Sequence, residues 1–451
     1  MLEAKPKDSL AAEVVQLETM PNLLGMHRAN PERYPFLLES AAHGPEQGRY
    51  SLLFAFPGRE IDLKAGDPPR DFLKQLDEEW QSERLAEADR SLPFSGGWFF
   101  YLSYEMAGLI EPSLRLPHDP AQEIAWAVRI PAAVIIDHHE NCTWLVSEQP
   151  DEGRIKHLAQ DAERSHDRDG SDQHLLLEEA LTEEAPEHYC HAVDRTRRYI
   201  RDGDVFQANL SRSWQGRLRS GIEPADVYQR LRASNPGPFA GLAVRGDQAV
   251  ISSSPERLVS RTQGWVNTRP IAGTRPRGSV QSQDKAMLDE LIGHPKERAE
   301  HIMLIDLERN DLGRICQPGS VEVDELMVLE SYAHVHHIVS NVRGQVDAGI
   351  TPGQILAAVF PGGTITGCPK VRCMEIIAEL EARPRGAYTG SLGYINRDGS
   401  MDSNILIRTM ETRGRALRLL AGAGIVADSI PEQELDETRA KARGMLLALE
   451  H

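Results

Sequence analysis

Three strand-rich blocks in the first third of the chain restrict its fold most strongly. They cover residues 36–56, 96–104 and 125–137, where aromatic, aliphatic and β-branched side chains occur in short runs bounded by glycine and polar turns. Such runs predict strands, so residues 1–150 are expected to be a mainly β region. Residues 151–184 then turn polar without periodicity, which is typical of a flexible linker.

Length and charge limit the classes of function. The 451 residues suffice for two or three average domains or for one large sheet-based unit. A net charge of -18, from 68 acidic and 50 basic residues, argues against nucleic acid and anionic membranes as partners, because both require a basic surface. No apolar run has membrane-spanning length, and the start of the chain lacks an apolar segment. We therefore expect a cytoplasmic, soluble protein.

The five cysteines are scattered along the chain, and no two of them form a Cys-x-x-Cys pair. An odd, scattered set indicates neither a disulfide framework nor a zinc site. This pattern is typical of a protein that remains in a reducing compartment.

Residues 268–278, Thr-Arg-Pro-Ile-Ala-Gly-Thr-Arg-Pro-Arg-Gly, combine two prolines and two glycines with three arginines. Proline fixes φ, and Gly273 permits close backbone approach, so the stretch predicts a rigid, cationic wall beside a cavity. A surface turn with solvated arginines is the alternative.

A strand is expected after Gly203, in Phe206-Gln-Ala-Asn-Leu210. Alternation places Gln207 and Asn209 on one face of this strand. Two neutral amides side by side either line a polar cavity or face water, and the sequence leaves both readings open.

A long helix is expected after Pro295, ending at Gly313. Glu300, Leu304 and Leu307 fall on one stripe of this helix. A carboxylate on an apolar stripe is costly unless it is paired or binds a cation, so Glu300 is a candidate metal ligand. A glutamate at a frayed helix start, partly in water, is the alternative.

Residues 332–340 predict another strand, with His334 and His336 on one face and His337 on the other. The three histidines therefore cannot form one compact metal site, although a single histidine could act as an acid or a base.

Two glycine-rich turns, at residues 360–370 and 419–429, each precede a helix. Free backbone amides at a helix N-terminus favour an anion. The final helix carries Glu434, Glu437 and Lys441 on one face, which in isolation is typical of a solvated surface stripe. Together these groups suit a small anionic substrate held with Mg2+.

Six ordered motifs between residues 185 and 445 resemble the chorismate-utilising enzymes. They include Arg269-Pro-Ile-Ala-Gly-Thr274, Asp306-Leu-Glu-Arg-Asn-Asp311, His336-His337, Phe360-Pro-Gly-Gly-Thr-Ile-Thr-Gly367, Ile407-Arg408-Thr409 and Gly422-Ala-Gly424. This family includes the large components of anthranilate synthase and aminodeoxychorismate synthase, together with isochorismate and salicylate synthases.

The resemblance implies an α+β fold in which two antiparallel β-sheets pack as a sandwich with peripheral helices. Residues 185–451 would form the chorismate-binding catalytic region, and the N-terminal third would join the same sandwich. Leu38, Glu39 and Ser40 resemble a region that binds tryptophan as an allosteric or structural ligand.

The resemblance also assigns roles to individual residues. Glu300 and Glu437, with Glu434 beside them, match Mg2+ ligands. His337 matches the histidine near the C4 hydroxyl, whose departure needs acid assistance, and Thr274 belongs to the same catalytic group. The positions that match substrate-binding residues are Arg408, Gly424, Lys441, Tyr388, Thr364 and Ala272.

Gln207 implies that the nucleophile is ammonia. Members that use water carry lysine at this position to activate it, whereas ammonia is already a competent nucleophile. The chain lacks a glutaminase segment of the Gly-x-Cys-x-Gly type, so ammonia is expected from a glutamine amidotransferase partner.

The sequence indicates the product of the reaction less strongly than it indicates the nucleophile. Ala272 is the residue that anthranilate synthases carry where one group of aminodeoxychorismate synthases has a nucleophilic lysine. Asn209 and Arg257 resemble the aminodeoxychorismate synthases instead, and we take that activity as the prediction. Anthranilate synthase and a non-catalytic chorismate or tryptophan sensor remain the alternatives.

Overall fold

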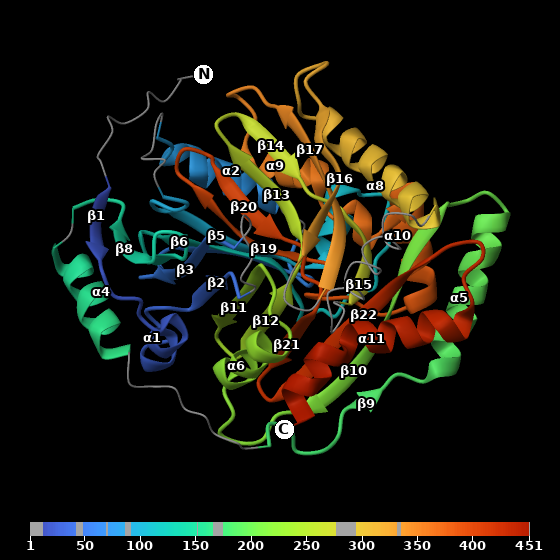
Figure 1. Cartoon of the computed structure of the whole chain (residues 1–451), viewed down its shortest axis with the longest axis horizontal. Helices are drawn as coiled ribbons and strands as arrows, with labels where there is room; N and C mark the ends of the chain where they lie inside the picture. Colours follow the sequence, from blue (N-terminus) through green and yellow to red (C-terminus); the bar gives the residue numbers. More distant parts are fainter. Residues whose placement is uncertain are drawn as a thin grey trace, which may run out of the picture.

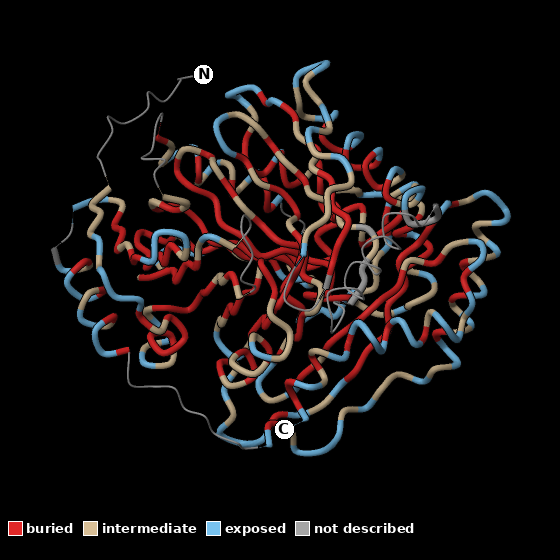
Figure 2. The backbone as a smooth tube through the Cα atoms, viewed as in Figure 1, coloured by how far each residue is buried: buried red, intermediate tan, exposed pale blue. Residues whose placement is uncertain are grey.

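The computed structural model describes residues 12–41, 48–68, 71–85, 92–150, 152–165, 175–276, 295–331 and 335–450. Within them, two antiparallel sheets form the centre of the molecule, and helices cover the outside (Figure 1). Buried backbone is concentrated where the sheets meet (Figure 2). None of the helices in these ranges is long and apolar enough to cross a bilayer.

The first sheet has twelve strands within the described ranges. Eleven lie side by side, and β9 (Thr182–Glu183) pairs with β10. The eleven, in spatial order, are β1 (Glu13–Leu17), β8 (Cys142–Ser147), β7 (Ala132–Asp137), β3 (Tyr50–Ala55), β2 (Phe36–Glu39), β11 (Phe239–Arg245), β12 (Gln248–Ser254), β21 (Thr409–Arg413), β22 (Ala416–Ile425), β10 (Gln207–Arg217) and β18 (Gly367–Cys368).

The second sheet has ten strands in the same part of the chain, and β16 (Glu322–Ser331) pairs with β17 at one edge. The other nine, in spatial order, are β15 (Ile271–Pro276), β17 (Val335–Gln345), β14 (Trp265–Thr268), β13 (Arg257–Thr262), β20 (Met401–Asn404), β19 (Ser391–Asn396), β5 (Gly97–Leu102), β6 (Glu123–Ile130) and β4 (Glu60–Lys64). Because β2 pairs with β11 and β5 with β19, the N-terminal third contributes strands to both sheets.

The helices pack on the outer faces of this sandwich. They are α1 (Leu23–Ala29), α2 (Phe72–Ser82), α3 (Ala107–Ile110), α4 (Glu152–Arg164), α5 (Pro186–Arg201), α6 (Pro224–Ser234), α8 (Pro295–Gly313), α9 (Pro352–Val359), α10 (Lys370–Glu381) and α11 (Pro431–Glu450), with short 3-10 turns η1 (Tyr104–Met106) and η3 (Gly363–Ile365).

An aromatic cluster fills the space between the sheets. Phe36 of the first sheet stacks on Phe99 of the second, with ring centroids 4.4 Å apart, and Trp126 stacks on both. Aromatic pairs in such geometry add to the hydrophobic gain from burial. The sheets therefore pack face to face, and the expected α+β sandwich is confirmed.

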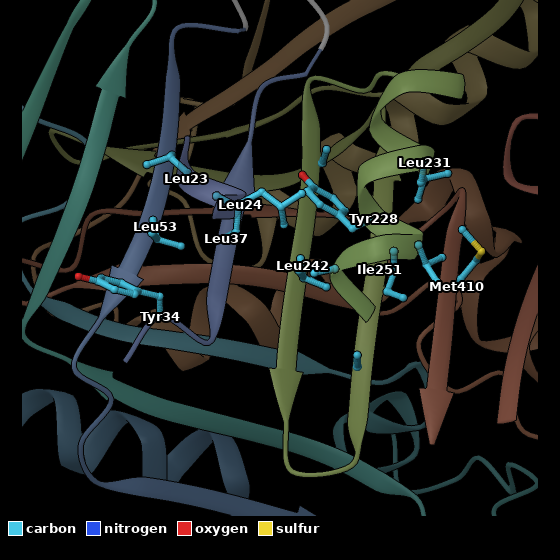
Figure 3. Close-up of a cluster of buried hydrophobic side chains, with 14 of the residues drawn as sticks. Leu23, Leu24, Tyr34, Leu37, Leu53, Tyr228, Leu231, Leu242, Ile251 and Met410 are labelled. Carbon is cyan, nitrogen blue, oxygen red and sulfur yellow. The ribbon is translucent and has the colours of Figure 1, made fainter. Parts of the chain in front are cut away.

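A second apolar cluster lies under the helices of the first sheet. Leu23 and Leu24 of α1, with Tyr228 and Leu231 of α6, meet strand side chains such as Leu242 (Figure 3). A third cluster lies where α2, α8, α9 and α10 contact the second sheet. Each sheet thus buries both faces, which explains why strands such as β5 are apolar throughout.

Helix α4 departs from the expected linker, because it occupies the first half of residues 151–184. Ile155, Leu158 and Ala162 recur at helical spacing and are buried against the first sheet. Three apolar positions among many charged ones give a weak periodic signal, and tertiary packing determines the helix.

Candidate active site

Two buried amides of β10 lie against the glycines of β22. Asn209 pairs with Gly424 across the strands. A Cβ atom on Gly424 would lie 2.2 Å from Nε2 of Gln207, and one on Gly422 would lie 2.7 Å from Oδ1 of Asn209. Glycine is therefore required at both positions to leave space for the amides.

The carbonyl oxygens Oε1 of Gln207 and Oδ1 of Asn209 are both buried, and neither has a hydrogen-bond partner within the described residues. An unsatisfied buried acceptor is costly unless a ligand or water completes it. The amides therefore do not face bulk water, which argues against one of the two alternatives that the sequence left open. The hydroxyl of Tyr388 lies close by, 2.6 Å from the position of a Cβ on Gly422.

Helix α11 places its charged face beside the same strand, at the lower right of Figure 1. Lys441 Nζ donates to the carbonyl of Gly422 at 3.1 Å and pairs with Glu437 at 2.8 Å. Both side chains are about half exposed, and Glu434 is one turn earlier and partly buried. The contact with Gly422 connects this stripe to the amide pair, so it is more than a solvated surface stripe.

Strands β15 and β17 bring Thr274 opposite His337 and Ala272 opposite Ile338, with an irregularity between them at Gly273. Burial, reinforced by the charge of Arg408, lowers the pKa of His337 to about 3. The imidazole is therefore neutral at physiological pH. The side chains of Ala272 and Thr274 lie outside the described residues, so their expected roles stay predictions.

Of the three arginines in the expected cationic wall at residues 268–278, only the side chain of Arg269 lies within the described residues, and its charge is neutralised. Its guanidinium pairs with Glu330 at 2.5 Å and with Glu325 at 2.5 Å. Two carboxylates from strand β16 neutralise this guanidinium, so the ion pairs of Arg269 connect β16 to the loop between β14 and β15.

Glu256 is the functional candidate that the sequence reasoning missed. It is 4% exposed, and its Oε1 has no hydrogen-bond partner among the described groups. Burial raises the pKa of Glu256 to about 8, a shift that the nearby hydroxyl of Thr364 opposes and the charge of Glu308 reinforces. Glu256 is therefore mainly protonated at neutral pH. Its place in Ser-Pro-Glu-Arg, directly after an apolar strand, was the available signal.

Arg408 lies beside Glu256 and is partly buried. Desolvation lowers the pKa of Arg408, and Glu256 acts in the opposite direction. Because Glu256 is mainly protonated, it does not neutralise this cation, and a partly buried cation without a paired carboxylate among the described residues favours an anionic ligand. Arg408 is thus suited to a carboxylate of the substrate.

The turn after α9 joins these groups to the amides. The carbonyl of Thr366 accepts from the backbone N–H of Asn209 at 2.9 Å, while Thr364, two residues earlier, lies beside Glu256. We call the combined set the polar site. It consists of Gln207, Asn209, Glu256, His337, Thr364, Tyr388, Arg408, Gly422 and Gly424.

Helix α8 closes the site on the side of the second sheet. Buried His301 contacts the hydroxyl of Ser340 in β17 at 2.7 Å, which seats the helix on that strand. Glu300, one residue earlier, is partly buried. Glu308 is buried near the other end, a second carboxylate that the sequence reasoning missed although it continues the stripe of Glu300 and Leu304.

Carboxylates are the ligand type that Mg2+ prefers. The structure does not gather three of them: within the described residues, no three Asp, Glu, His or Cys side chains form a group that could hold a metal. Glu434 and Glu437 lie one turn apart on α11, and Glu300 lies on α8. Mg2+ often binds one or two carboxylates together with water and a substrate oxygen, and binding by Glu300, Glu434 and Glu437 stays a prediction.

A separate cavity of about 440 Å³ lies at one end of the sandwich, and Leu38 and Glu39 line it, whereas Ser40 does not. Glu39 accepts from the Tyr228 hydroxyl at 2.8 Å and pairs with Arg232 at 3.0 Å. Arg257 also lines the cavity, held by Asp402. The volume suits a small ligand, and tryptophan as that ligand stays a prediction.

The chorismate binding enzyme family matches residues 34–447. The chain belongs to this family. Aminodeoxychorismate synthase component 1 of Bacillus subtilis (strain 168) is 39% identical over 456 residues, which cover 94% of this chain and 93% of that protein. The anthranilate synthase component I-like protein of Synechocystis sp. is 42% identical over 413 residues, covering 90% and 84%.

The fold of the chorismate-binding enzyme agrees with a solved relative. The crystal structure of anthranilate synthase component I from Streptococcus pneumoniae TIGR4 superposes with a TM-score of 0.78 at 34% identity, covering 88% of this chain and 92% of that one. The protein is therefore a chorismate-utilising enzyme. Relatives of both names have similar identity, so overall similarity does not separate the two amination reactions.

Proposed function

We propose that the protein is an aminodeoxychorismate synthase component I, which converts chorismate and ammonia into 4-amino-4-deoxychorismate for folate biosynthesis. The observation that carries this proposal is the buried amide pair, Gln207 and Asn209, with its two unpartnered carbonyl oxygens. An amide has no basic group with which to deprotonate water. It can accept hydrogen bonds from ammonia, which needs no activation.

Glu256 supplies the acid that this reaction requires. Loss of the C4 hydroxyl as water needs a proton, and a buried carboxyl with a pKa of about 8 still carries one at neutral pH. His337, with a pKa of about 3, carries almost none. We therefore assign the proton to Glu256, and assign to neutral His337 a hydrogen bond that orients the leaving oxygen.

Attack of ammonia at C2 expels the protonated C4 hydroxyl as water and leaves Glu256 as a carboxylate. A second ammonia then adds at C4 and expels the amine at C2, so the net reaction consumes one ammonia. Arg408 holds a substrate carboxylate during both steps, because its partly buried charge is paired with no carboxylate among the described residues.

Asn209 and Arg257, which resemble the aminodeoxychorismate synthases, favour this product over anthranilate. Anthranilate synthase remains the second candidate, favoured by Ala272 and by the name of the 42% identical relative.

We further propose three ligands. Mg2+ would be held by Glu300 and Glu437, with Glu434 beside them, and would neutralise a chorismate carboxylate. A glutamine amidotransferase subunit would supply the ammonia, consistent with relatives that are named as component 1. Tryptophan would occupy the cavity lined by Leu38 and Glu39.

Product analysis tests the proposal. Purified protein with chorismate, Mg2+ and ammonium salt should release a product that becomes 4-aminobenzoate only when a lyase is added. Fluorescent anthranilate without added lyase would establish the second candidate. A non-catalytic sensor would consume no chorismate, and its ligand binding would be unchanged by Glu300→Gln and Glu437→Gln.

A further inference from the structure

A buried ion pair lies beside the polar site and takes no part in the proposed chemistry. Glu381 is the last residue of α10, and Arg385 follows four residues later. Their side chains are 3% and 1% exposed, and the guanidinium contacts both carboxylate oxygens, with Nη2 2.7 Å from Oε1 and Nε 3.1 Å from Oε2. Burying two charges is costly, and a carboxylate at a helix C-terminus meets the negative end of the helix dipole. The pair therefore requires an explanation beyond the stability of α10.

Arg385 uses all five of its N–H donors. Besides the two contacts with Glu381, Nη2 donates to the carbonyl of Asn209 at 2.6 Å. Nη1 donates to the carbonyl of Ile365 at 3.3 Å and to a neighbouring hydroxyl at 3.4 Å. Asn209 lies in β10, and Ile365 lies in the turn η3, directly after Thr364. One guanidinium thus joins two segments of the polar site that are distant in the sequence.

The ion pair also completes one edge of β10. Strand β22 pairs along the opposite edge, whereas β18 and β9 pair with only two residues of β10 each. Between those two short strands, the carbonyl of Asn209 accepts from Arg385, and the backbone N–H of Ser211 donates to Oε1 of Glu381 at 2.8 Å. Buried backbone groups left unpaired here would be costly. The ion pair therefore fixes the backbone from which the amide of Asn209 projects.

Tyr388 contacts the same guanidinium. The guanidinium carbon of Arg385 lies 5.6 Å from the centre of the Tyr388 ring and 4.7 Å from the centre of the Tyr104 ring, which are distances of cation–π contacts. The hydroxyl of Tyr388 lies next to Gly422 of β22. Arg385 thus contacts Asn209 through its backbone and Tyr388 through its ring.

We propose that Arg385, held by Glu381, is a positioning residue for the ammonia site, which fixes the amide of Asn209 relative to Gly424 and Tyr388. The inference rests on the proposed function, because it assigns the amide pair to ammonia. Arg385 acts through these groups and not on the substrate, since its side chain is buried and all its donors are used. A guanidinium suits this task because its planar fork presents five donors in fixed directions, whereas the ammonium of lysine has three.

Arg385→Lys tests the proposal in steady-state kinetics of the full-length protein with chorismate, Mg2+ and ammonium. The variant keeps a cation opposite Glu381 and loses the contacts with Asn209 and Ile365. We expect KM for ammonium to rise by about tenfold, because a small displacement of the amides weakens the site of the nucleophile. A purely structural role would lower the amount of active enzyme, and therefore kcat, without changing this KM.

Arg129→Lys is the matched control. Arg129 of β6 is also mostly buried and donates to two carboxylates and two backbone carbonyls. Its partners, Glu83, Glu148, Gly97 and Ile130, lie outside the polar site. This variant should lower the stability of the fold and leave KM for ammonium unchanged.

A combination with Gly424→Ala separates positioning from a general loss of stability. The added methyl group would displace the same amide pair. The combined effect of Gly424→Ala and Arg385→Lys on KM for ammonium should therefore be smaller than the product of the single effects. Glu381→Gln, which keeps an acceptor for Ser211 and removes the charge, should raise this KM less, and it is the test variant if Arg385→Lys does not fold.

An unchanged KM for ammonium in folded Arg385→Lys, or an equal rise in Arg129→Lys, would overturn the proposal. Formation of anthranilate would refute the proposed product and leave this test valid, because ammonia is the nucleophile in both reactions. If the parent protein consumes no chorismate, the proposed function fails, and hydrogen exchange of the Asn209 and Ser211 amides decides the inference. Faster exchange in Arg385→Lys than in Arg129→Lys would then support positioning of β10 by Arg385, and equal exchange would overturn it.

Discussion

Glu256 and Glu437 both belong to the proposed chemistry, yet they lie in opposite environments. Glu256 is buried between the sheets, and its pKa is raised to about 8. Glu437 is half exposed on α11 and forms an ion pair with Lys441. In our proposal one residue type therefore provides two functions, since burial retains a proton whereas exposure leaves a charge available for a cation.

Helix α8 shows the same contrast along its length. Glu300 is partly buried near its start, whereas Glu308 is buried between Thr268 and Gly363. The helix thus presents a candidate metal ligand at one end and a buried carboxyl further along.

The largest expected effect is that of Glu256→Gln. Loss of the acid should lower kcat by about 100-fold or more, with little change in KM for chorismate, because the amide keeps the shape but has no proton to give. Steady-state rates with ammonium measure this. If this variant kept a near-normal kcat, Glu256 would not be the acid, and the proposed difference in function between Glu256 and Glu437 would be wrong.

Glu437→Gln should weaken the binding of Mg2+ and leave proton donation by Glu256 unchanged. We expect the Mg2+ concentration for half-maximal rate to rise by about tenfold, with recovery of rate at high Mg2+. Asp436→Asn changes an exposed neighbour on the same helix and serves as the control. An identical Mg2+ dependence in both variants would argue against Glu437 as a ligand.

Gly424→Ala tests the amide pair. The added Cβ would lie 2.2 Å from Nε2 of Gln207 and displace the amide, so kcat/KM for ammonium should fall by about tenfold while the fold is kept. Gly313→Ala, at a position with no neighbouring atom within 4 Å, is the matched control. Equal ammonium kinetics in the two variants would remove Gln207 from the nucleophile site.

The last prediction concerns the stability of the fold and not the activity. The pKa of Glu256 rises from 4.5 to about 8 on folding, so its contribution to stability is complete below pH 4.5 and is lost as pH rises through about 8. Relative to the parent protein, Glu256→Gln should gain about 3.5 kcal/mol in free energy of unfolding between pH 5 and pH 8. Urea unfolding at both values measures it, and a difference that does not change with pH would contradict the assigned burial.

Local patterns predicted much of this molecule. The proline at residue 295 and the glycine at residue 313 mark the two real ends of α8, because capping and periodicity act over a few residues. Alternation also placed Gln207 and Asn209 on one face of β10. The site itself depends on pairings between distant strands, such as Asn209 with Gly424, and no local pattern encodes them.

Local sequence patterns also could not identify the buried carboxyls. Glu256 follows an apolar strand, and Glu308 lies on the stripe of Glu300, but only packing shows that both lose contact with water. Without that burial a glutamate has no raised pKa and no role as an acid. The family resemblance indicated the substrate, and the structure indicated the proposed acid.

The most direct test uses chorismate, Mg2+ and 15N-labelled ammonium with the full-length protein, followed by mass spectrometry of the first product. Our proposal predicts a labelled amine that retains the enolpyruvyl group of chorismate. A labelled aromatic amine that has lost this group, accompanied by an equal amount of pyruvate, would contradict it.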